Sequence, residues 1–179
     1  GGTDPADLMT LPATQHGVRF STDGKATVSD GTRLGEVGFG TGTAAGAWKR
    51  VFVFGGARSD PATQVVNLDA VHVLDASEPK STLPHAIRGI TAVPVSEHYI
   101  YLAGGYPNDE TGFTDDGFLF IATSGKFVPA KPLPIKSMVH LATDGEWVYC
   151  LGGEDRKKHR SDKVWRIRAQ ELLAPVIVK

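Results

Sequence analysis

The sequence repeats one pattern three times: an apolar strand runs directly into a pair of glycines. The pairs are Gly55-Gly56, Gly104-Gly105 and Gly152-Gly153, so their first glycines are 49 and 48 residues apart. A Leu-Pro pair recurs too, at Leu83-Pro84 and Leu133-Pro134, 50 residues apart. A period of about 50 residues that combines a strand with glycines is typical of the blades of a β-propeller. The pattern therefore predicts an all-β chain built from such units.

Each unit is predicted to be a four-stranded blade that begins at Leu-Pro. We expect a tail or cloning remnant at 1–10, a first blade at 11–82, a second at 83–132 and a third at 133–179. The strands of the second blade are expected at 90–95, 99–103, 118–122 and 126–129. Those of the third blade are expected at 138–143, 147–151, 163–168 and 175–179. In the first blade, two strands are expected near 37–45 and 71–74.

An inserted hairpin is predicted near 14–33 in the first blade. Asp23-Gly24 separates two short strand-like segments, 18–22 and 25–28, and Asp-Gly between strands is a strong hairpin signal. The hairpin would either project from the blade edge or supply a strand that closes the sheet.

About three blades are fewer than a closed ring needs, because propellers usually have four to eight. The sequence therefore predicts a partial propeller, a fragment that packs against the remainder of the propeller in a longer chain. The alternative is a half-propeller that pairs with a second copy of the chain.

Composition excludes several classes of function. A net charge of −1 gives no electrostatic footprint for nucleic acid or an anionic membrane surface, and no apolar run is long enough to span a bilayer. The single cysteine, Cys150, excludes an internal disulfide framework and a multi-cysteine zinc site, and we expect it to be a small buried hydrophobe. The start carries no signal segment, which leaves a cytoplasmic location and a periplasmic or secreted one after signal removal both open.

Blade topology predicts where a site would lie. In an up-and-down blade, the loop into the first strand and the loop from the second to the third strand lie on one face. That face should collect the polar residues that follow Leu-Pro and Gly-Gly. The candidate ligand-binding residues among them are Arg58, Arg88, Tyr106, Asn108, Lys136 and Arg156.

The residues that could act on a ligand lie in the segment 154–160 and at Arg88. In the segment 154–160, Glu154 and His159 are candidates for proton transfer, while Arg156 suits a carboxylate; the alternative is a solvated charged loop. Arg88, beside a channel mouth, would contact an anion or form a salt bridge between blades, and Lys136 is interpreted as its equivalent in the next unit. His85 and His140 are interpreted as structural histidines. The acidic loop 108–116 lacks the spacing of an EF-hand, and no metal site is predicted.

The repeated segments resemble kelch repeats over about residues 34–170. They differ from the usual kelch pattern because the fourth strand lacks a tryptophan, and Phe127 is interpreted as its substitute. The phrases 101–106 and 149–155 look most like bacterial proteins of the sialic-acid mutarotase branch, the N-acetylneuraminate epimerase-like proteins. This resemblance implies an isomerase that interconverts sugar anomers by acid–base ring opening without a cofactor. The alternative is a noncatalytic kelch scaffold that binds a protein or glycan on its loop face.

Overall fold

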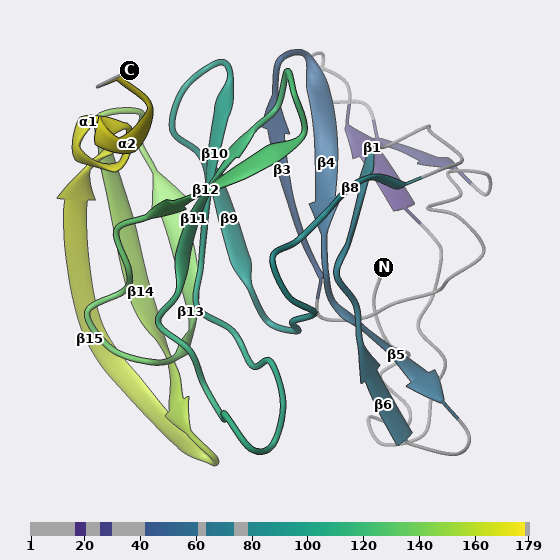
Figure 1. Cartoon of the computed structure of the whole chain (residues 1–179), viewed down its shortest axis with the longest axis vertical. Helices are drawn as coiled ribbons and strands as arrows, with labels where there is room; N and C mark the ends of the chain where they lie inside the picture. The colour runs from purple at the N-terminus through teal and green to yellow at the C-terminus, as the bar shows by residue number, and fades with distance from the viewer. Residues whose placement is uncertain (1–16, 21–25, 30–41, 61–63, 74–78, 178–179) are drawn as a thin grey trace.

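Three antiparallel sheets stand side by side in this computed structural model, which describes residues 17–20, 26–29, 42–60, 64–73 and 79–177 (Figure 1). The first blade has the strand order β3-β4-β7-β8, and the second has the order β9-β10-β11-β12. The third consists of β13-β14-β15 among the described residues. This architecture confirms the predicted all-β, partial propeller fold.

The bounds of the blade strands follow the repeat closely. The first blade consists of β3 (Thr43–Ala47), β4 (Arg50–Phe54), β7 (Ala70–Val73) and β8 (Pro79–Thr82). The second consists of β9 (Thr91–Pro94), β10 (Tyr99–Ala103), β11 (Gly117–Ile121) and β12 (Lys126–Ala130). The third consists of β13 (Met138–Thr143), β14 (Trp147–Arg156) and β15 (His159–Arg168).

The end of the third blade differs from the prediction. The prediction of a strand at 175–179 is wrong. After β15 the chain forms two short helices, α1 (Ala169–Leu172) and α2 (Ala174–Ile177), and the second one covers the start of this range. Leu172 is 1% exposed in the core between the second and third blades. Burial of this apolar side chain favours the helical turn.

Two hairpins extend the blades on one side. The predicted loop at 154–160 is instead the end of a long hairpin, in which Gly153 of β14 stands opposite Ser161 of β15. The segment after the first glycine pair forms a hairpin as well, from β5 (Ala57–Asp60) and β6 (Gln64–Asn67). Sequence patterning missed both because neither segment shows the alternation of apolar and polar residues that marks a half-buried strand.

In the region of the predicted inserted hairpin, β1 (Gly17–Phe20) pairs antiparallel with β2 (Ala26–Ser29). Val18 stands opposite Val28, while Asp23-Gly24 lies outside the described residues. Within the described part of the chain, β1 and β2 form a sheet of their own and add no strand to a blade.

The two sequence signatures meet in one repeated hydrogen-bond pattern. The second glycine of a pair donates its N–H to a backbone carbonyl that follows the next Leu-Pro pair. Gly56 donates to Ile87 O and Gly105 donates to Ser137 O, each at 2.9 Å. In both cases the acceptor lies four residues after the leucine. The first glycine lies so close to this connection that a Cβ on Gly104 would be 2.4 Å from the Ser137 carbonyl oxygen and 2.8 Å from Leu133 Cδ1. The glycines and the Leu-Pro pair are therefore two sides of one close backbone contact.

The core consists of two layers between the blades. Between the first and second blades, Phe52, Phe54 and Phe120 are at most 1% exposed, and their rings contact one another edge-on or stacked. Between the second and third blades, the layer includes Tyr101, Leu119, Val148 and Cys150. Burial of both faces of the middle blade explains the continuous apolar runs in its strands.

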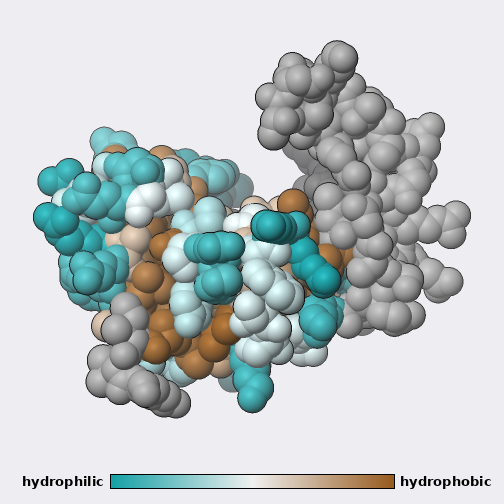
Figure 2. Space-filling model, turned by 90° about the horizontal axis from the view of Figure 1, so that it is seen from above, coloured by the Kyte–Doolittle hydropathy of each residue, from teal (hydrophilic) through white to brown (hydrophobic). Residues whose placement is uncertain are grey.

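Helices contribute little to the described chain. None of those described is long and apolar enough to cross a membrane. At the end that carries α1 and α2, hydrophobic residues reach the surface between hydrophilic ones (Figure 2).

Candidate functional site

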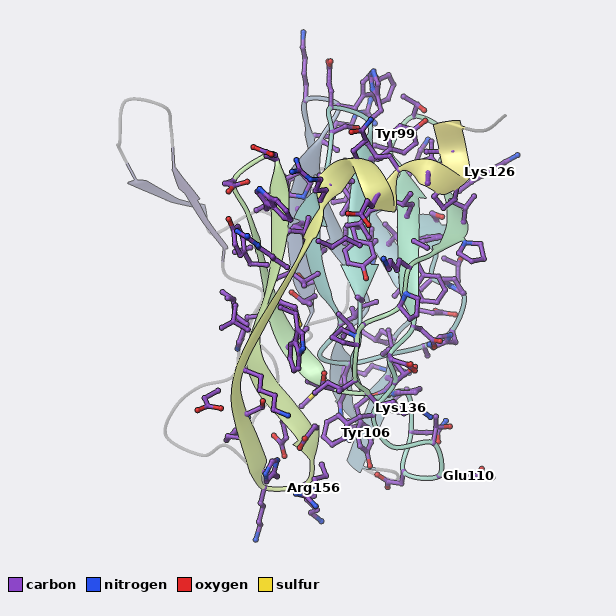
Figure 3. The ribbon with its side chains drawn as sticks, turned by 90° about the vertical axis from the view of Figure 1, so that its left-hand side faces the viewer. Tyr99, Tyr106, Glu110, Lys126, Lys136 and Arg156 are labelled. Carbon is purple, nitrogen blue, oxygen red and sulfur yellow. The ribbon has the colours of Figure 1, made fainter. Side chains whose placement is uncertain are left out.

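The loops that follow Leu-Pro and Gly-Gly lie at one end of the molecule, as the blade topology predicts. Figure 3 shows Tyr106, Glu110, Lys136 and Arg156 toward this end, and Tyr99 and Lys126 toward the other. We call this end the loop rim; its described members lie in 57–60, 64–69, 84–90, 104–116, 134–138 and 152–161. The fold thus positions most of the candidate residues at the loop rim from separate parts of the sequence.

Arg88 and Tyr106 form the best-defined contact of the loop rim. Their backbones pair in an antiparallel bridge, in which Tyr106 N donates to Arg88 O at 2.8 Å. The Arg88 guanidinium lies over the Tyr106 ring, with its Cζ 4.4 Å from the ring centroid. Because the backbone pairing fixes both side chains on neighbouring segments, the cation–π contact is built into the fold.

Asn67, the last residue of the hairpin β5–β6, holds this pair. Its Oδ1 accepts a hydrogen bond from Arg88 Nη1 at 3.1 Å. Its Nδ2 donates to the carbonyls of Tyr106 at 2.8 Å and Pro107 at 2.5 Å. Asn67 therefore orients the guanidinium and connects it to the backbone of the next loop, so three segments from two blades meet here.

Tyr106 continues the contact into the loop 107–113. Its hydroxyl donates to Asp109 Oδ1 at 2.7 Å, and this hydrogen bond raises the pKa of the Tyr106 phenol. The Phe113 ring packs edge-on against Tyr106, with centroids 5.2 Å apart. We call Asn67, Arg88, Tyr106, Asp109 and Phe113 the arginine cluster. It combines a cation, a carboxylate and two aromatic rings, groups that can bind a polar ring with an anionic substituent.

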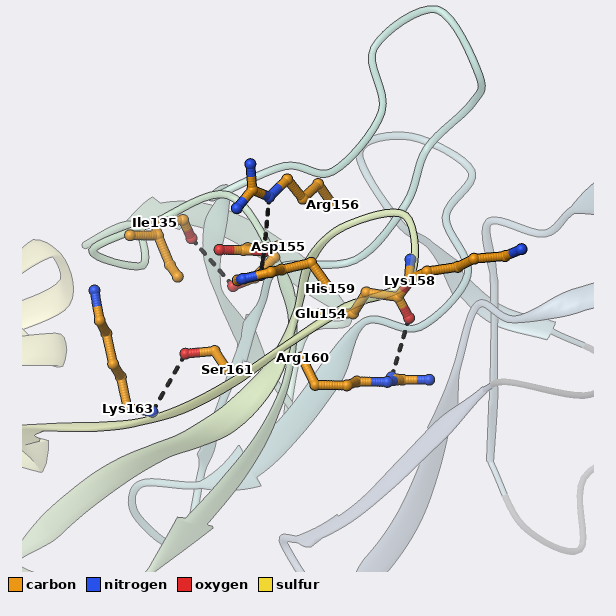
Figure 4. Close-up of polar contacts among 10 residues, drawn as sticks. Ile135, Glu154, Asp155, Arg156, Lys158, His159, Arg160, Ser161 and Lys163 are labelled. Atoms are coloured by element: carbon orange, nitrogen blue, oxygen red, sulfur yellow. Dashed lines mark hydrogen bonds and ion pairs between the residues drawn. The ribbon is translucent and has the colours of Figure 1, made fainter.

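A second group of charges lies at the end of the β14–β15 hairpin (Figure 4). Glu154 Oε2 is 3.0 Å from Arg160 Nη1, and Glu154 Oε1 accepts a hydrogen bond from Lys158 N at 2.8 Å. Asp155 Oδ1 is 2.5 Å from His159 Nδ1 and 4.0 Å from Arg156 Nε. The hydrogen bond with His159 is the main reason that the pKa of Asp155 is below its usual value.

The contacts at this hairpin end give each predicted residue a defined partner. The Glu154 carboxylate is paired and mostly buried, with 15% of its side chain exposed. The His159 imidazole is oriented by a carboxylate and remains about half exposed, at 47%. A carboxylate-oriented imidazole can accept or donate a proton through its free nitrogen, so His159 retains the chemistry that its sequence position suggested.

The remaining predicted residues lie at the loop rim with other roles. Lys136 is exposed, and the equivalence with Arg88 is wrong: the repeated hydrogen bonds align Ile87 with Ser137, so Arg88 corresponds to Met138. Arg58 lies on β5 rather than in a loop, opposite Val66 of β6. Asn108 shapes its own loop, since its Oδ1 accepts a hydrogen bond from Thr111 N at 2.7 Å.

The repeat alignment relates the two charged groups. Arg88 pairs with Tyr106, and its counterpart Met138 pairs with Glu154. Tyr106 and Glu154, each the first residue after a glycine pair, therefore occupy the same position in successive blades. The arginine cluster and the hairpin end are variations of one structural element, with different side chains.

Sequence reasoning missed Asn67. It lies more than 20 residues upstream of Arg88 and carries no motif of its own. A tertiary contact sets its position, because the next residue, Leu68, donates its N–H to Gly56 O and so brings the end of β6 back to the glycine pair.

The contacts of His85 support its structural interpretation only in its packing. Its ring packs edge-on against Phe118, and its Nε2 lies 3.5 Å from Asp116 Oδ2, but this buried nitrogen has no hydrogen-bond partner in the described part of the chain. In the part of the chain that the structure describes, no group of three or more His, Cys, Asp or Glu side chains is arranged to hold a metal ion.

The fold and the repeated contacts define a partial β-propeller of the kelch type. Among solved structures, that of the protein YjhT matches this chain with a TM-score of 0.69 at 16% sequence identity. The match covers 84% of this chain and 55% of the YjhT chain, so this chain spans about half the length of that protein. No protein-family model and no curated protein matches the sequence.

Proposed function

We propose that the loop rim binds an anionic sugar and that the chain is part of a carbohydrate-directed kelch propeller. The reaction we propose is the interconversion of sugar anomers of the sialic-acid type, without a cofactor. The orientation of Arg88 by Asn67 and Tyr106 is the observation that carries the proposal. The sequence resemblance to the sialic-acid mutarotase branch adds the substrate class.

Arg88 has the donors that such a ligand needs. A guanidinium carries five N–H groups in a planar fork, and Asn67 takes a hydrogen bond from one nitrogen of Arg88. Stacking on Tyr106 fixes the plane of the fork. The remaining N–H groups can bind a sugar carboxylate in the bidentate manner, and little side-chain entropy is lost because the guanidinium is already held.

Ring opening requires two proton transfers. A base removes the proton of the anomeric hydroxyl while an acid protonates the ring oxygen, and the bond between that oxygen and the anomeric carbon breaks to give the open-chain ketone. Reclosure on the other face of the carbonyl reverses both transfers. We propose His159, oriented by Asp155, and Glu154 as the proton-transfer groups of this chain.

A noncatalytic function remains the second candidate, and the hairpin end supports it. The side chains of Arg156 and Arg160 are 74% and 78% exposed, and Lys158 between them is exposed too. A projecting cationic hairpin of this kind could contact an anionic glycan or an acidic protein surface, which requires no proton transfer.

Nuclear magnetic resonance of anomer exchange separates the two candidates. With N-acetylneuraminate and the full chain, the enzyme proposal predicts exchange faster than the spontaneous rate. It also predicts that Glu154→Gln and His159→Asn each reduce the acceleration about a hundredfold or more, from the lower end of the range for a general acid or base upward. Lys157→Gln, in the turn of the same hairpin, is the matched control and should retain the rate.

Two results would contradict parts of the proposal. Exchange at the spontaneous rate, with saturable binding of the sugar, would favour the noncatalytic candidate. Full acceleration in both Glu154→Gln and His159→Asn would leave the reaction standing but remove these residues from it.

A further inference from the structure

Met138 lies between the two groups of charges at the loop rim. Its backbone pairs with that of Glu154 in the register of β13 and β14. It is also the counterpart of Arg88 in the repeat, and its side chain is half-buried. The sequence pattern predicts no role for Met138 in binding or catalysis, but these contacts place it beside residues of both kinds.

The Met138 side chain reaches from the third blade to the second, where it covers Gly89. Gly89 directly follows Arg88 in the sequence. A Cβ on Gly89 would overlap Met138 Sδ and would lie 3.0 Å from Met138 Cγ. The glycine therefore leaves the space that the thioether occupies, and an unbranched, flexible side chain suits such an irregular gap.

The same position reaches back to the preceding blade in both repeats. Arg88 pairs through its backbone with the loop of its own blade, while its side chain forms a hydrogen bond with Asn67 of the first blade. Met138 pairs through its backbone with Glu154 of its own blade, while its side chain packs on Gly89 of the second. Together these contacts run from Asn67 to Glu154 across three blades.

The contacts inside the β14–β15 hairpin fix Glu154 only relative to that hairpin. Its carboxylate is held by Arg160 and by the backbone N–H of Lys158, which belong to the same hairpin. The Met138 backbone lies against the base of the hairpin, because a Cβ on Gly153 would overlap the Met138 carbonyl oxygen. Met138 therefore connects the hairpin that carries the carboxylate to the second blade.

We propose that Met138 is a positioning residue, which sets the distance between the sugar-binding Arg88 and the proton-transfer group Glu154. The inference rests on the proposed function, in which one sugar is bound by the guanidinium and acted on by the carboxylate. Loss of the thioether should therefore affect the rate of ring opening more than the affinity for the sugar. Arg88 keeps its own partners, Asn67 and Tyr106, without Met138.

The variant Met138→Ala should fold, because residues on either side of it remain tied to the second blade. Ser137 N donates to Thr114 O at 3.1 Å. Leu141 N donates to Thr91 Oγ1 at 3.3 Å. The substitution thus removes the thioether and leaves these hydrogen bonds between the blades in place.

NMR of N-acetylneuraminate anomer exchange over a range of sugar concentrations tests the proposal on the full chain. Met138→Ala should lower kcat about tenfold and change KM less than about twofold, since a displacement on the order of 1 Å can cost up to about a hundredfold in rate. Met138→Leu is the matched control and should retain about half of kcat or more, because it replaces the thioether with an apolar side chain of similar volume.

A second measurement requires no reaction. The chain has two methionines, so labelling of their methyl groups gives two signals, and that of Met138 should show a nuclear Overhauser contact with the α-protons of Gly89. Met138→Ala should shift the amide signals of both Gly89 and Glu154, and Met138→Leu should shift them less. This readout follows the connection between the two segments whether or not the chain is an enzyme.

Four results would overturn the proposal: an unchanged kcat in Met138→Ala, a raised KM at unchanged kcat, equal rate losses in Met138→Ala and Met138→Leu, or amide shifts at Gly89 or Glu154 alone. Exchange at the spontaneous rate in the unchanged chain would instead overturn the proposed function. The amide signals then test the placement of Met138 by themselves, because shifts at both residues support it and shifts at one of them contradict it.

Discussion

Gly104 and Gly112 share a left-handed backbone conformation, with φ of +69° and +71°, but differ in their surroundings. A Cβ on Gly104 would lie 2.4 Å from the Ser137 carbonyl oxygen, whereas nothing lies within 4 Å of one on Gly112. Gly112→Ala should therefore lose about 1 kcal/mol of stability from conformational strain alone. Gly104→Ala should lose about 3 kcal/mol or more, since the backbone contact must also shift.

Urea denaturation of both variants measures this difference. Equal losses of unfolding free energy would show that the glycine pairs serve only local backbone geometry. The close contact between the glycine pair and the Leu-Pro connection would then not contribute to stability.

Asp155 and His159 provide a prediction about protonation. The hydrogen bond with His159 lowers the pKa of Asp155 in the folded state, so its stabilising contribution is present above the usual Asp range near pH 4 and is lost as the pH falls through the lowered value. His159→Asn should raise the pKa of Asp155 toward its usual value. Carboxyl carbon shifts followed through an NMR pH titration measure it, and an unchanged pKa would contradict the orientation of the imidazole by Asp155.

At the scale of the element, the repeat places the same residue type in two environments. Tyr101 of β10 and Tyr149 of β14 occupy equivalent positions before their glycine pairs. The Tyr101 hydroxyl is buried between blades and donates to Lys131 O at 2.7 Å, and burial raises the pKa of this phenol strongly. The Tyr149 hydroxyl donates to Asp144 at 2.9 Å on an exposed part of the third blade.

This comparison predicts unequal effects of one substitution. Tyr101→Phe should cost about 1 kcal/mol, the net value of a buried hydrogen bond, and Tyr149→Phe less than about 0.5 kcal/mol. Thermal unfolding of the two variants measures both effects. A larger loss for Tyr149→Phe would mean that the outer face of the third blade is covered in solution.

The elements that the sequence predicts well are those whose signal is local. β10 and β13 occupy the predicted ranges because apolar runs end at a glycine pair or begin after Leu-Pro. The hairpin β5–β6 and the end of the hairpin β14–β15 were missed because their residues do not alternate between apolar and polar, and the two strands are held in place by pairing with each other. The wrong strand at 175–179 has a tertiary cause, since Leu172 packs into the core between blades.

At the site too, the sequence predicts which residues lie at the loop rim but not which of them contact one another. Blade topology predicts that Arg88 and Tyr106 lie at one end, but not that they stack. Asn67 could not be inferred, because the distance that matters is across blades rather than along the sequence. The register of the repeat, and with it the correspondence of Arg88 with Met138, follows only from the repeated hydrogen bonds.

At the scale of the whole molecule, the described blades bring a prearranged guanidinium and a carboxylate-oriented imidazole to one rim. The arginine cluster draws on both the first and second blades, while His159 belongs to the third. A site made in this way requires the blades to be packed together, so ligand binding and the packing of the blades should be linked. Ligand binding should therefore be measured on the whole chain, in which the blades are packed together.

Calorimetric titration of the full chain with N-acetylneuraminate tests the central claim that Arg88 makes the loop rim a site for an anionic sugar. The account predicts saturable binding that weakens at least about tenfold in Arg88→Gln, the loss of a charged hydrogen bond of about 1.5–3 kcal/mol. The exposed-residue control, Lys126→Gln at the opposite end of the molecule, should bind as the unchanged chain does. Equal affinity in Arg88→Gln and the unchanged chain would contradict the account.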